Sequence, residues 1–461
     1  MNQNIIQTIL SSTIIKNESF QSLKLSPNDW IISSIHSINC IYFYNIQQWL
    51  LDEKHSKDMF MNIERLILSL RKLLEYYPLL NGIFKLFDED NKVCVTQNDS
   101  KGGILFVSTI VNISLSELPL SLEEYTNTKI IPEALQLINV VNADTLFHVR
   151  HTRFSCGSVA LGISLNHQVG DAHSYFQIVK DWAQLYKNLE YQPNVCHQRS
   201  LLELTLTDIE ILKKTNPNFD NRKSLAVKAE NSPLVQQIKQ IILKIFRFSV
   251  DELNRMKSDA LTHLSSNVAY VSTFDVLTTH LYRHVMLARN YSTSSITKLY
   301  ISTNIRSRLN QPSVPNTYFG NAIMFSYLEM NMTELINENY LGLLASQVHK
   351  AIEENNNNDI RTTLSWIICQ TDKKKIAPTC NLDETDFTIS AWNKMGMYSD
   401  SDFELDVYPC RIIFPIDTKF NGTAILFSTE KNDASIDVIL GLEINEMERL
   451  ETNSDFRKYR V

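Results

Sequence analysis

Glycine is scarce in this sequence, with 11 among 461 residues, and the glycine-rich strings that bind phosphate are absent. Neither G-x-G-x-x-G nor G-x-x-x-x-G-K-[ST] occurs, so the sequence does not support dinucleotide or P-loop nucleotide binding. The seven cysteines are scattered and odd in number, and no C-x-x-C spacing indicates a zinc or redox site. A reducing cytosol is the simplest setting for such a chain.

A strongly basic character and long apolar runs are also missing. The formal net charge is −7 and Lys and Arg form no sustained stripe, which argues against nucleic acid or an anionic membrane as the main partner. No stretch approaches the ~20 apolar residues of a membrane helix. The first 20 residues lack the basic start of a signal peptide. We therefore expect a cytoplasmic protein without a membrane span.

The length favours two domains, because 461 residues exceed what one hydrophobic core usually serves. We divide the chain into an N-terminal domain over 1–187, a crossover linker over 188–235 and a C-terminal domain over 236–461. The linker is rich in Asn, Lys, Pro and Glu and has weak periodicity. Helical and strand periodicities occur in both halves, so the sequence predicts a mixed α/β fold.

Local patterns predict several individual elements. Residues 63–77 place apolar side chains on one helical face before a proline, and the strings IFKLF and KVCVTQ predict a hairpin around the polar turn 88–91. The asparagine run 355–358 predicts a solvated loop. Near the C-terminus, residues 421–422 and 431–433 predict two tight hairpin turns.

The strongest local signal is the string NHQVGDAHS. Residues 157–167 alternate between apolar and smaller or polar side chains, which predicts a strand, and helical spacing begins at Ser174. His167 therefore lies at the inner end of a strand, and Asp171 lies in the turn before a helix. A His-x-x-x-Asp string alone is weak, because it arises often by chance.

Three interpretations of this string are open. His167 could be a satisfied core histidine, with Asp171 as the N-cap of the following helix. Alternatively, His167, Asp171 and His173 could bind a metal ion. In the third, His167 is a general base that takes a proton from a hydroxyl or amine. A thioester substrate needs no covalent nucleophile, which fits the absence of a G-x-S-x-G elbow.

The order of several strings resembles the BAHD acyltransferases over nearly the whole chain. SLNHQVGDAHSYFQIVKDWAQLY is similar to the family's His-x-x-x-Asp-Gly segment and its trailing helix, and LSPNDW and SLRKLLEYYPLLNG resemble its N-terminal landmarks. VSTFDVLTTHLYRHVMLAR, NIRSRLNQPSVPNTYFGNAI and FTISAWNKMGMYSDSDFELD follow in the family's order. Several separate strings in the correct order are far more specific than one tetrad.

This resemblance implies a fold and an activity. It implies two similarly sized chloramphenicol-acetyltransferase-like domains, each a mixed β-sheet flanked by helices, with a channel between them. It also implies acyl-CoA as co-substrate and a small alcohol or amine as acceptor. His167 matches the family's catalytic base, and Asp171 matches a residue that points away and pairs with an arginine, here Arg306.

Trp392 has an unusual place in its predicted strand. It shares a face with Ser390 and Thr388, opposite the apolar Phe387 and Ile389, whereas a core tryptophan should have the other parity. A boundary tryptophan that packs between domains would explain this parity. The resemblance implies a catalytic alternative, in which the indole N–H faces the cleft and donates to the oxyanion of the tetrahedral intermediate.

Other family positions are partly kept. Gly320 and Asn321 match a Y-F-G-N segment that supports a turn near the coenzyme. Asp402 matches the first residue of the D-F-G-W-G motif, which is sometimes assigned as a second base, although we expect it to hold structure at a distance. The chain departs from the family at Ala172 and at 404–406, where it has Glu-Leu-Asp. These departures predict an altered loop and weaker donor binding.

The sequence thus predicts an acyl-CoA-dependent O- or N-acyltransferase of secondary metabolism. We expect a monomer that binds no metal, no nucleic acid and no membrane. A catalytically inactive small-molecule-binding protein of the same fold is the main alternative, favoured by the altered 402–406 segment. A metal-dependent hydrolase is the third possibility.

Overall fold

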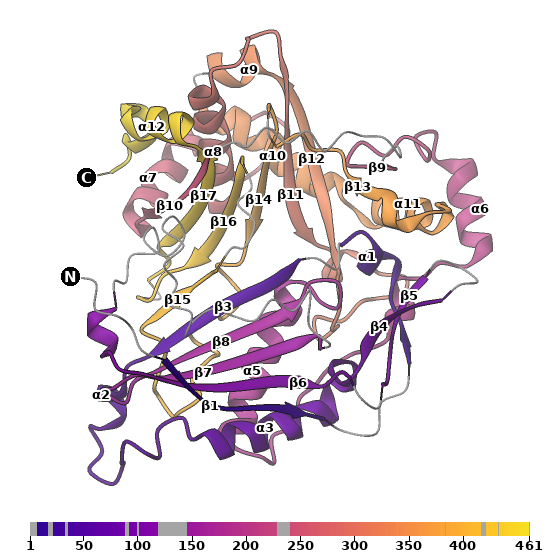
Figure 1. Cartoon of the computed structure of the whole chain (residues 1–461). Helices are drawn as coiled ribbons and strands as arrows, with labels where there is room; N and C mark the ends of the chain where they lie inside the picture. Colours follow the sequence, from indigo (N-terminus) through magenta and orange to yellow (C-terminus); the bar gives the residue numbers. More distant parts are fainter. Residues whose placement is uncertain are drawn as a thin grey trace.

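The computed structural model has two large β-sheets as its framework, with helices packed against each of them (Figure 1). The two sheets come from successive parts of the chain, apart from one strand that crosses over. The structure describes residues 7–16, 22–32, 36–87, 92–98, 101–118, 145–227, 240–338, 340–382, 384–415, 421–431 and 433–460.

The first sheet is built mainly from the N-terminal part of the chain. Its strands are ordered β1 (Gln7–Ile15), β6 (Ile104–Val111), β7 (Phe147–Arg153), β8 (Val159–Asn166), β3 (Ser37–Tyr44) and β15 (Arg411–Ile413). Only β6 and β7 run parallel among these neighbouring pairs. The helices α3 (Ile63–Tyr76) and α5 (Ala172–Lys187) contribute buried apolar residues to the core beneath this sheet.

The second sheet belongs to the C-terminal part of the chain. Its strands are ordered β10 (Ile241–Phe248), β17 (Ile436–Glu443), β16 (Thr423–Ser428), β14 (Phe387–Ala391), β11 (Ile296–Asn304) and β12 (Ile323–Asn331). β14 runs parallel to both of its neighbours, so this sheet is also mixed. The helices that share its core are α7 (Val250–Leu261), α8 (Thr273–Arg289), α9 (Met332–Asn337), α10 (Leu341–Glu354) and α12 (Ile444–Thr452).

Smaller elements connect the two sheets. A three-stranded sheet contains β2 (Leu23–Lys24), β5 (Lys92–Thr96) and β4 (Ile83–Phe87), and β9 (Leu225–Val227) pairs with β13 (Ile376–Pro378). The short helices α1 (Pro27–Trp30) and α2 (Ile46–Trp49) precede and follow β3. The crossover holds α6 (Leu206–Thr215), which packs against α11 (Asn357–Cys369), and its residues 228–235 lie outside the described part of the chain.

Several sequence predictions are confirmed. The helix expected over 63–77 is α3, and the Asn62 side chain caps its first turn by accepting from the backbone N–H of Arg65. The expected hairpin is the pair β4 and β5, although its turn residues 88–91 lie outside the described residues. The antiparallel strands β16 and β17 are joined by residues 429–435, so 431–433 lies in a hairpin connection as expected, although the connection is longer than a tight turn and residue 432 is not described.

Two turn and loop predictions were wrong. Asn355 is buried, Asn356 caps α11, and Asn357 begins that helix, so the asparagine run is a junction between two helices. Asparagine has this role because its side-chain oxygen accepts from free backbone N–H groups at a helix start. Residues 421–422 form a turn, with φ of 63° at Gly422, but they are not the turn of a hairpin, because β14 and β17 already pair with the two edges of β16. Residues 416–420, just before this turn, lie outside the described part of the chain.

The strand β15 also departs from the sequence division, which places 236–461 in the C-terminal domain. It pairs antiparallel with β3 in the first sheet. Met397, Tyr398 and Phe403 join the core of that sheet. Phe403 packs edge-on against Trp182 of α5, with ring centroids 4.7 Å apart. The C-terminal part of the chain therefore completes the N-terminal core.

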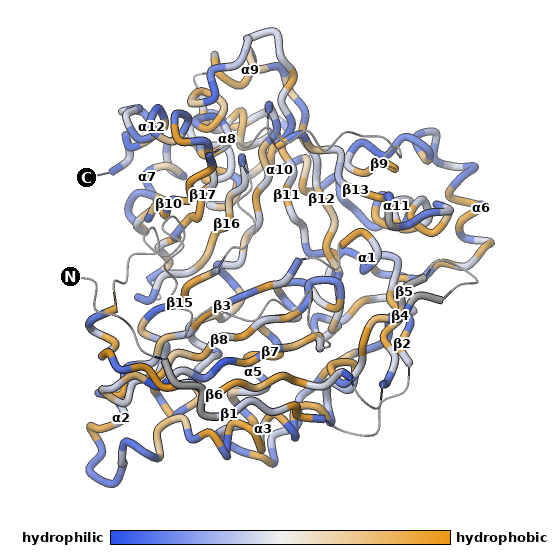
Figure 2. Tube along the Cα trace, viewed as in Figure 1, coloured by the Kyte–Doolittle hydropathy of each residue, from blue (hydrophilic) through white to orange (hydrophobic). Residues whose placement is uncertain are grey.

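Hydropathy along the chain agrees with this layering. Hydrophobic residues follow the strands of both sheets, whereas α6 and α12 carry hydrophilic stretches (Figure 2). Within the described part of the chain, no helix is both long enough and apolar enough to cross a membrane.

Candidate active site

The candidate site begins at the end of β8. Every residue of β8 is buried between β3 and β7, and the backbone N–H of His167 extends the ladder by donating to the carbonyl of His36 at 2.9 Å. A short turn follows, in which the Asn166 side chain accepts from the backbone N–H of Gln168 at 2.9 Å. The helix α5 then starts at Ala172. The predicted order of strand, turn and helix is confirmed.

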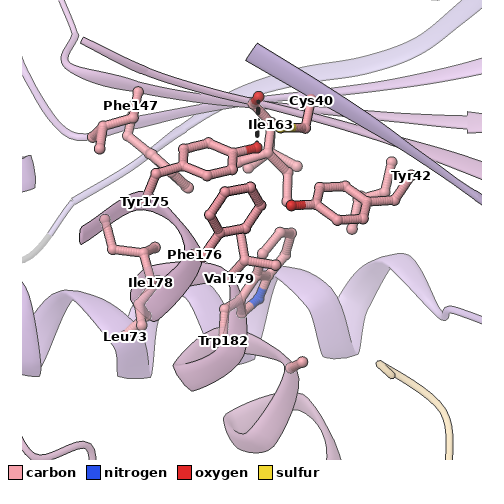
Figure 3. Packing of buried hydrophobic residues seen from close by; sticks show 14 of the residues in the cluster. Cys40, Tyr42, Leu73, Phe147, Ile163, Tyr175, Phe176, Ile178, Val179 and Trp182 are labelled. Atoms are coloured by element: carbon pink, nitrogen blue, oxygen red, sulfur yellow. Dashed lines mark hydrogen bonds between the residues drawn. The ribbon is translucent and has the colours of Figure 1, made fainter. Parts of the chain in front are cut away.

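Packing beneath this turn fixes where it lies. Tyr175, in the first turns of α5, donates its hydroxyl to the carbonyl of Ile163 in β8 at 3.1 Å (Figure 3). Further along the helix, the indole N–H of Trp182 donates to the hydroxyl of Ser69 in α3 at 2.9 Å. Both aromatic side chains are fully buried. Burial of such a side chain contributes roughly 1.5–3 kcal/mol, so the strand and helix around His167 are firmly held.

Asp171 binds Arg306 with both of its carboxylate oxygens. Its two carboxylate oxygens accept from the guanidinium at 2.8 and 3.0 Å, and both side chains are at most 1 % exposed. It also caps α5 by accepting from the backbone N–H of Ser174 at 2.9 Å. Burial alone would raise the pKa of Asp171, but Arg306 and backbone N–H groups outweigh burial and lower that pKa to about 2. Asp171 is therefore an ionised anchor between the two halves of the chain.

Gly320 and Asn321 complete the support of the turn. The Gly320 carbonyl accepts from Arg306 at 3.0 Å and from the Ser174 hydroxyl at 2.9 Å. A Cβ at this glycine would lie 1.7 Å from a guanidinium nitrogen of Arg199, so a side chain does not fit. The Asn321 amide donates to the carbonyl of His167 at 2.9 Å. These bonds hold the backbone at the histidine itself.

A second buried ion pair lies beside the first, and no local sequence pattern indicates it. The Arg199 guanidinium binds both carboxylate oxygens of Asp29 at 3.0 and 3.1 Å, and it also donates to the carbonyl of Val169 at 2.9 Å. Asp29 in turn accepts from the Asn321 amide at 3.0 Å. Asp29 lies in the LSPNDW string, and pairing that string with a distant arginine would have required spatial information.

His167 opens onto a cavity of about 1110 Å³. The cavity is lined from both sheets, by His167 and His36 on the first and by Trp392, Thr388 and other residues on the second. His167 is only half-buried, so its ring is not sealed in the core. The interpretation of His167 as a satisfied core histidine does not fit this placement, whereas the N-cap expected at Asp171 is present.

Burial controls the charge of His167. It lowers the pKa of the imidazole from its usual 6.5, although the histidine's own backbone, Asp171 and Asn321 act in the opposite direction. The Nδ1 atom is buried and has no hydrogen-bond partner among the described residues. At neutral pH the ring is therefore uncharged, which is the state that can accept a proton.

His36 is a second imidazole at the same place, and the sequence analysis missed it. β3 and β8 pair in a register that sets Ser37 opposite Asn166, so His36 and His167 face each other at the next step. Burial first, and then the positive charge that His167 can carry, lower the pKa of His36. Only the sheet register brings these two histidines together, because 130 residues separate them in the chain.

Trp392 follows β14 and lines the cavity, the side that the family resemblance implied. Phe387 and Ile389 are fully buried on the opposite face of the strand. The indole N–H of Trp392 donates to the hydroxyl of Ser390 at 3.0 Å. The indole also packs against Phe176 and Phe414, with ring centroids 6.0 and 5.6 Å away, so it spans the junction of the two sheets.

Comparison with known proteins gives the arrangement a family. Residues 5–457 match the sequence model described as the Transferase family. The chain belongs to this family of BAHD acyltransferases. It is 26% identical over 385 residues to shikimate O-hydroxycinnamoyltransferase of Nicotiana tabacum, covering 83% of this chain and 85% of that protein.

One further relative and one solved structure extend the comparison. A hydroxycinnamoyl-CoA:5-hydroxyanthranilate N-hydroxycinnamoyltransferase of Avena sativa is 24% identical, covering 82% of this chain and 83% of the relative. The crystal structure of F. graminearum TRI101 with coenzyme A and deoxynivalenol superposes with a TM-score of 0.75 at 16% identity, covering 95% of this chain and 98% of that one. The protein is an acyl-CoA-dependent acyltransferase with the two-domain chloramphenicol-acetyltransferase-like fold.

In this BAHD acyltransferase, Asp402 lies apart from the cavity. Its carboxylate binds the ammonium of Lys187, the last residue of α5, at 2.6 Å, and it is not among the described cavity-lining residues. A catalytic assignment for Asp402 therefore does not fit its position. The expectation that this aspartate holds structure at a distance agrees with the ion pair.

The altered 404–406 segment of this acyltransferase is accommodated locally. The Glu404 carboxylate is buried and accepts from the backbone N–H of Met61 and from the hydroxyl of Tyr186, both at 2.7 Å. Leu405 is exposed. Asp406 has φ of 58°, a left-handed conformation that aspartate tolerates better than most residues. Ala172, the other departure, lines the cavity.

The side chains of the metal interpretation do not converge in the acyltransferase. Both oxygens of Asp171 are bound to Arg306, and Nε2 of His173 donates to the carbonyl of Asn316 at 2.8 Å. Among the described residues, no group of three or more His, Cys, Asp or Glu side chains is placed to hold a metal ion.

Proposed function

We propose that this acyltransferase moves an acyl group from acyl-CoA directly to the hydroxyl or amine of a small molecule, with His167 as the general base. The observation that carries the proposal is an uncharged imidazole, placed at the end of a buried strand and open to a cavity lined from both sheets. CoA-bound TRI101 shares the fold, which supports acyl-CoA as the co-substrate.

The proposed reaction needs no covalent enzyme intermediate. His167 takes the proton of the acceptor as its oxygen or nitrogen attacks the thioester carbonyl. The tetrahedral intermediate then expels the coenzyme A thiolate, which receives a proton from the imidazolium. Asn321 and the Asp171–Arg306 pair act through the backbone, because they hold the turn from which the ring projects.

Trp392 is proposed to stabilise the oxyanion. Its indole N–H already meets an oxygen at the cavity surface, the hydroxyl of Ser390. In the reaction the N–H would exchange this hydroxyl for the negative oxygen of the intermediate. Hydrogen bonds to a developing charge strengthen in the transition state, so the exchange favours turnover.

The domain division, cellular location and oligomeric state proposed for this enzyme are those expected from the sequence. We propose an N-terminal domain over 1–187 and a C-terminal domain over 236–461, joined by a crossover, with residues 395–414 returning to the first sheet. We also propose a cytoplasmic monomer of secondary metabolism. Size-exclusion chromatography with light scattering tests the monomer, and a dimer mass would contradict it.

The mechanism is tested by replacing the base. General-base catalysis contributes about 10² to 10⁴ in rate, so His167→Ala should lower coenzyme A release in the presence of an acceptor by that factor. The release can be followed with a thiol reagent. Thermal unfolding of the variant should match the wild type, because the ring is at the cavity surface. Full activity in this variant would reject the mechanism.

The oxyanion role makes a second prediction. Trp392→Phe keeps an aromatic ring against Phe176 and Phe414 but removes the N–H donor. Turnover should fall by about 10²-fold while the KM for the donor changes little. An unchanged kcat would remove Trp392 from the mechanism and leave it as a packing residue at the junction.

A further inference from the structure

The cavity wall carries few charges. Among its described lining residues, one side chain is acidic and two are permanently basic, and three are histidines. These six are Asp171, Lys85, Arg306, His36, His167 and His173. The remaining described lining residues are uncharged. Whether a charged ligand finds a counter-ion in the wall therefore depends on these six side chains.

Asp171 and Arg306 present no net charge to a ligand. They bind each other through two hydrogen bonds and are buried to at least 99 %. Arg306 also donates to the carbonyls of Tyr318 and Gly320, both at 3.0 Å. The guanidinium is therefore fully engaged in holding the turn and is not available to pair with a substrate carboxylate.

The three histidines are uncharged at neutral pH. Burial lowers the pKa of His36, of His167 and of His173 below 6.5. An uncharged imidazole can donate or accept one hydrogen bond at each nitrogen, but it does not neutralise an anion. These rings therefore supply no counter-ion for an anionic ligand.

Lys85 lies at the solvent side of the wall. It is in β4, opposite Cys94, and its side chain is exposed. Water and salt screen an exposed ammonium, so it contributes little to a charge held deep in the cavity. The described wall has no other ammonium or guanidinium and no carboxylate beyond Asp171.

Much of the remaining described wall is apolar. Trp30 and Ile31 come from the end of α1, Phe325 from β12, and Ile376 and Pro378 from β13. Burying apolar ligand surface against such residues is favourable at roughly 25 cal/mol per Å². Neutral hydroxyls, among them Ser302, Thr388 and Ser390, supply the polar points of the wall.

We propose that the acceptor of this enzyme is an uncharged, largely apolar alcohol or phenol. The inference rests on the proposed acyltransfer function and narrows its substrate class. A carboxylate or an ammonium on the acceptor would lose its water in the cavity without gaining a fixed counter-ion from the described lining residues. The donor does not conflict with this, because an uncharged pantetheine arm separates the thioester from the phosphates of coenzyme A.

Matched acceptor pairs test the proposal. The purified enzyme is given hydroxycinnamoyl-CoA, benzoyl-CoA or acetyl-CoA together with shikimate or its methyl ester, or with 5-hydroxyanthranilate or its methyl ester. Each pair keeps the nucleophile, removes the carboxylate charge and adds one methyl group. Geraniol and deoxynivalenol extend the panel of neutral alcohols. Products are identified by mass spectrometry, and kcat/KM should favour the neutral member of a pair by at least about tenfold.

The outcomes distinguish the proposed acyltransfer function from the inference that the acceptor is uncharged. If coenzyme A release depends on His167 and a neutral acceptor is preferred, both hold. If that release occurs but the acid is used equally well or better, or no neutral acceptor is acylated, the neutral-acceptor inference fails and the acyltransfer function stands. If no donor releases coenzyme A with any acceptor, the proposed function itself fails and the inference falls with it.

A second test introduces a positive charge into the cavity wall. Ala377 in β13 lines the cavity and is half-buried. Ala377→Lys places an ammonium on the wall, and Ala377→Met adds similar length without charge. The lysine variant should shift the ester-to-acid preference towards the acid by about tenfold relative to the methionine variant. The same preference in both variants would show that charge on this wall does not select the acceptor.

Discussion

Two aspartates from the family motifs hold the two ends of the same helix. Asp171 caps the first turn of α5, and Asp402 binds Lys187, its last residue. Asp171 and Arg306 are at most 1 % exposed, whereas Asp402 and Lys187 are 12 % and 19 % exposed. The helix start supports His167 at the cavity, while the helix end lies away from it. An aspartate at the helix start therefore supports the catalytic site, whereas an aspartate at the helix end supports only the fold.

The physical difference between the two pairs is the cost of breaking them. A fully buried charge that loses its partner cannot recover water, and the penalty is several kcal/mol. A pair that still touches solvent loses less, because water replaces the missing partner. Asp171 also accepts from the backbone N–H of Ala322 at 2.9 Å, which ties α5 to the segment before β12.

The largest effect is expected at Asp171. Asp171→Asn leaves Arg306 charged and buried, and should lower the free energy of unfolding by about 3–5 kcal/mol as well as reducing activity. Urea denaturation measures the loss. In a double-mutant cycle with Arg306→Gln, the two changes should couple by at least about 1 kcal/mol. Additive losses would mean that the pair does not act as a unit.

A smaller effect is expected at Asp402. Asp402→Asn should lower the free energy of unfolding by about 1 kcal/mol and leave kcat/KM within about twofold of wild type. Asp400→Asn is the matched control, because Asp400 binds Lys180 of the same helix at 3.3 Å with both side chains more than a third exposed. The control should change little. A large loss of turnover in Asp402→Asn would show that this aspartate takes part in catalysis.

Those parts of the site that depend on the periodicity of neighbouring residues could be predicted from the sequence. Period-two spacing placed His167 at a strand end, and the parity of Trp392 indicated that this side chain lies off the core face of its strand. The Asp171–Arg306 pair followed from family resemblance, since nothing local joins residues 135 positions apart.

The features that were missed depend on long-range pairing. His36 meets His167 only through the register of β3 with β8, and Arg199 reaches Asp29 across 170 positions. The hairpin predicted at 421–422 was wrong for the same reason, because the dipeptide looks the same whether the strand after it pairs with the strand before it or, like β16, with β14 and β17. The run 355–358 shows that asparagine suits a helix cap as well as a loop.

The pH dependence of wild type and His167→Ala, measured with one acceptor and one donor, tests the central claim most directly. Because burial lowers the pKa of His167, the wild-type kcat/KM should stay constant near neutral pH and fall only as the pH drops through a midpoint below 6.5, where the base becomes protonated. His167→Ala should lose this acid limb and be slower by about 10² to 10⁴ on the plateau. An identical acid limb and plateau in the variant would contradict the account.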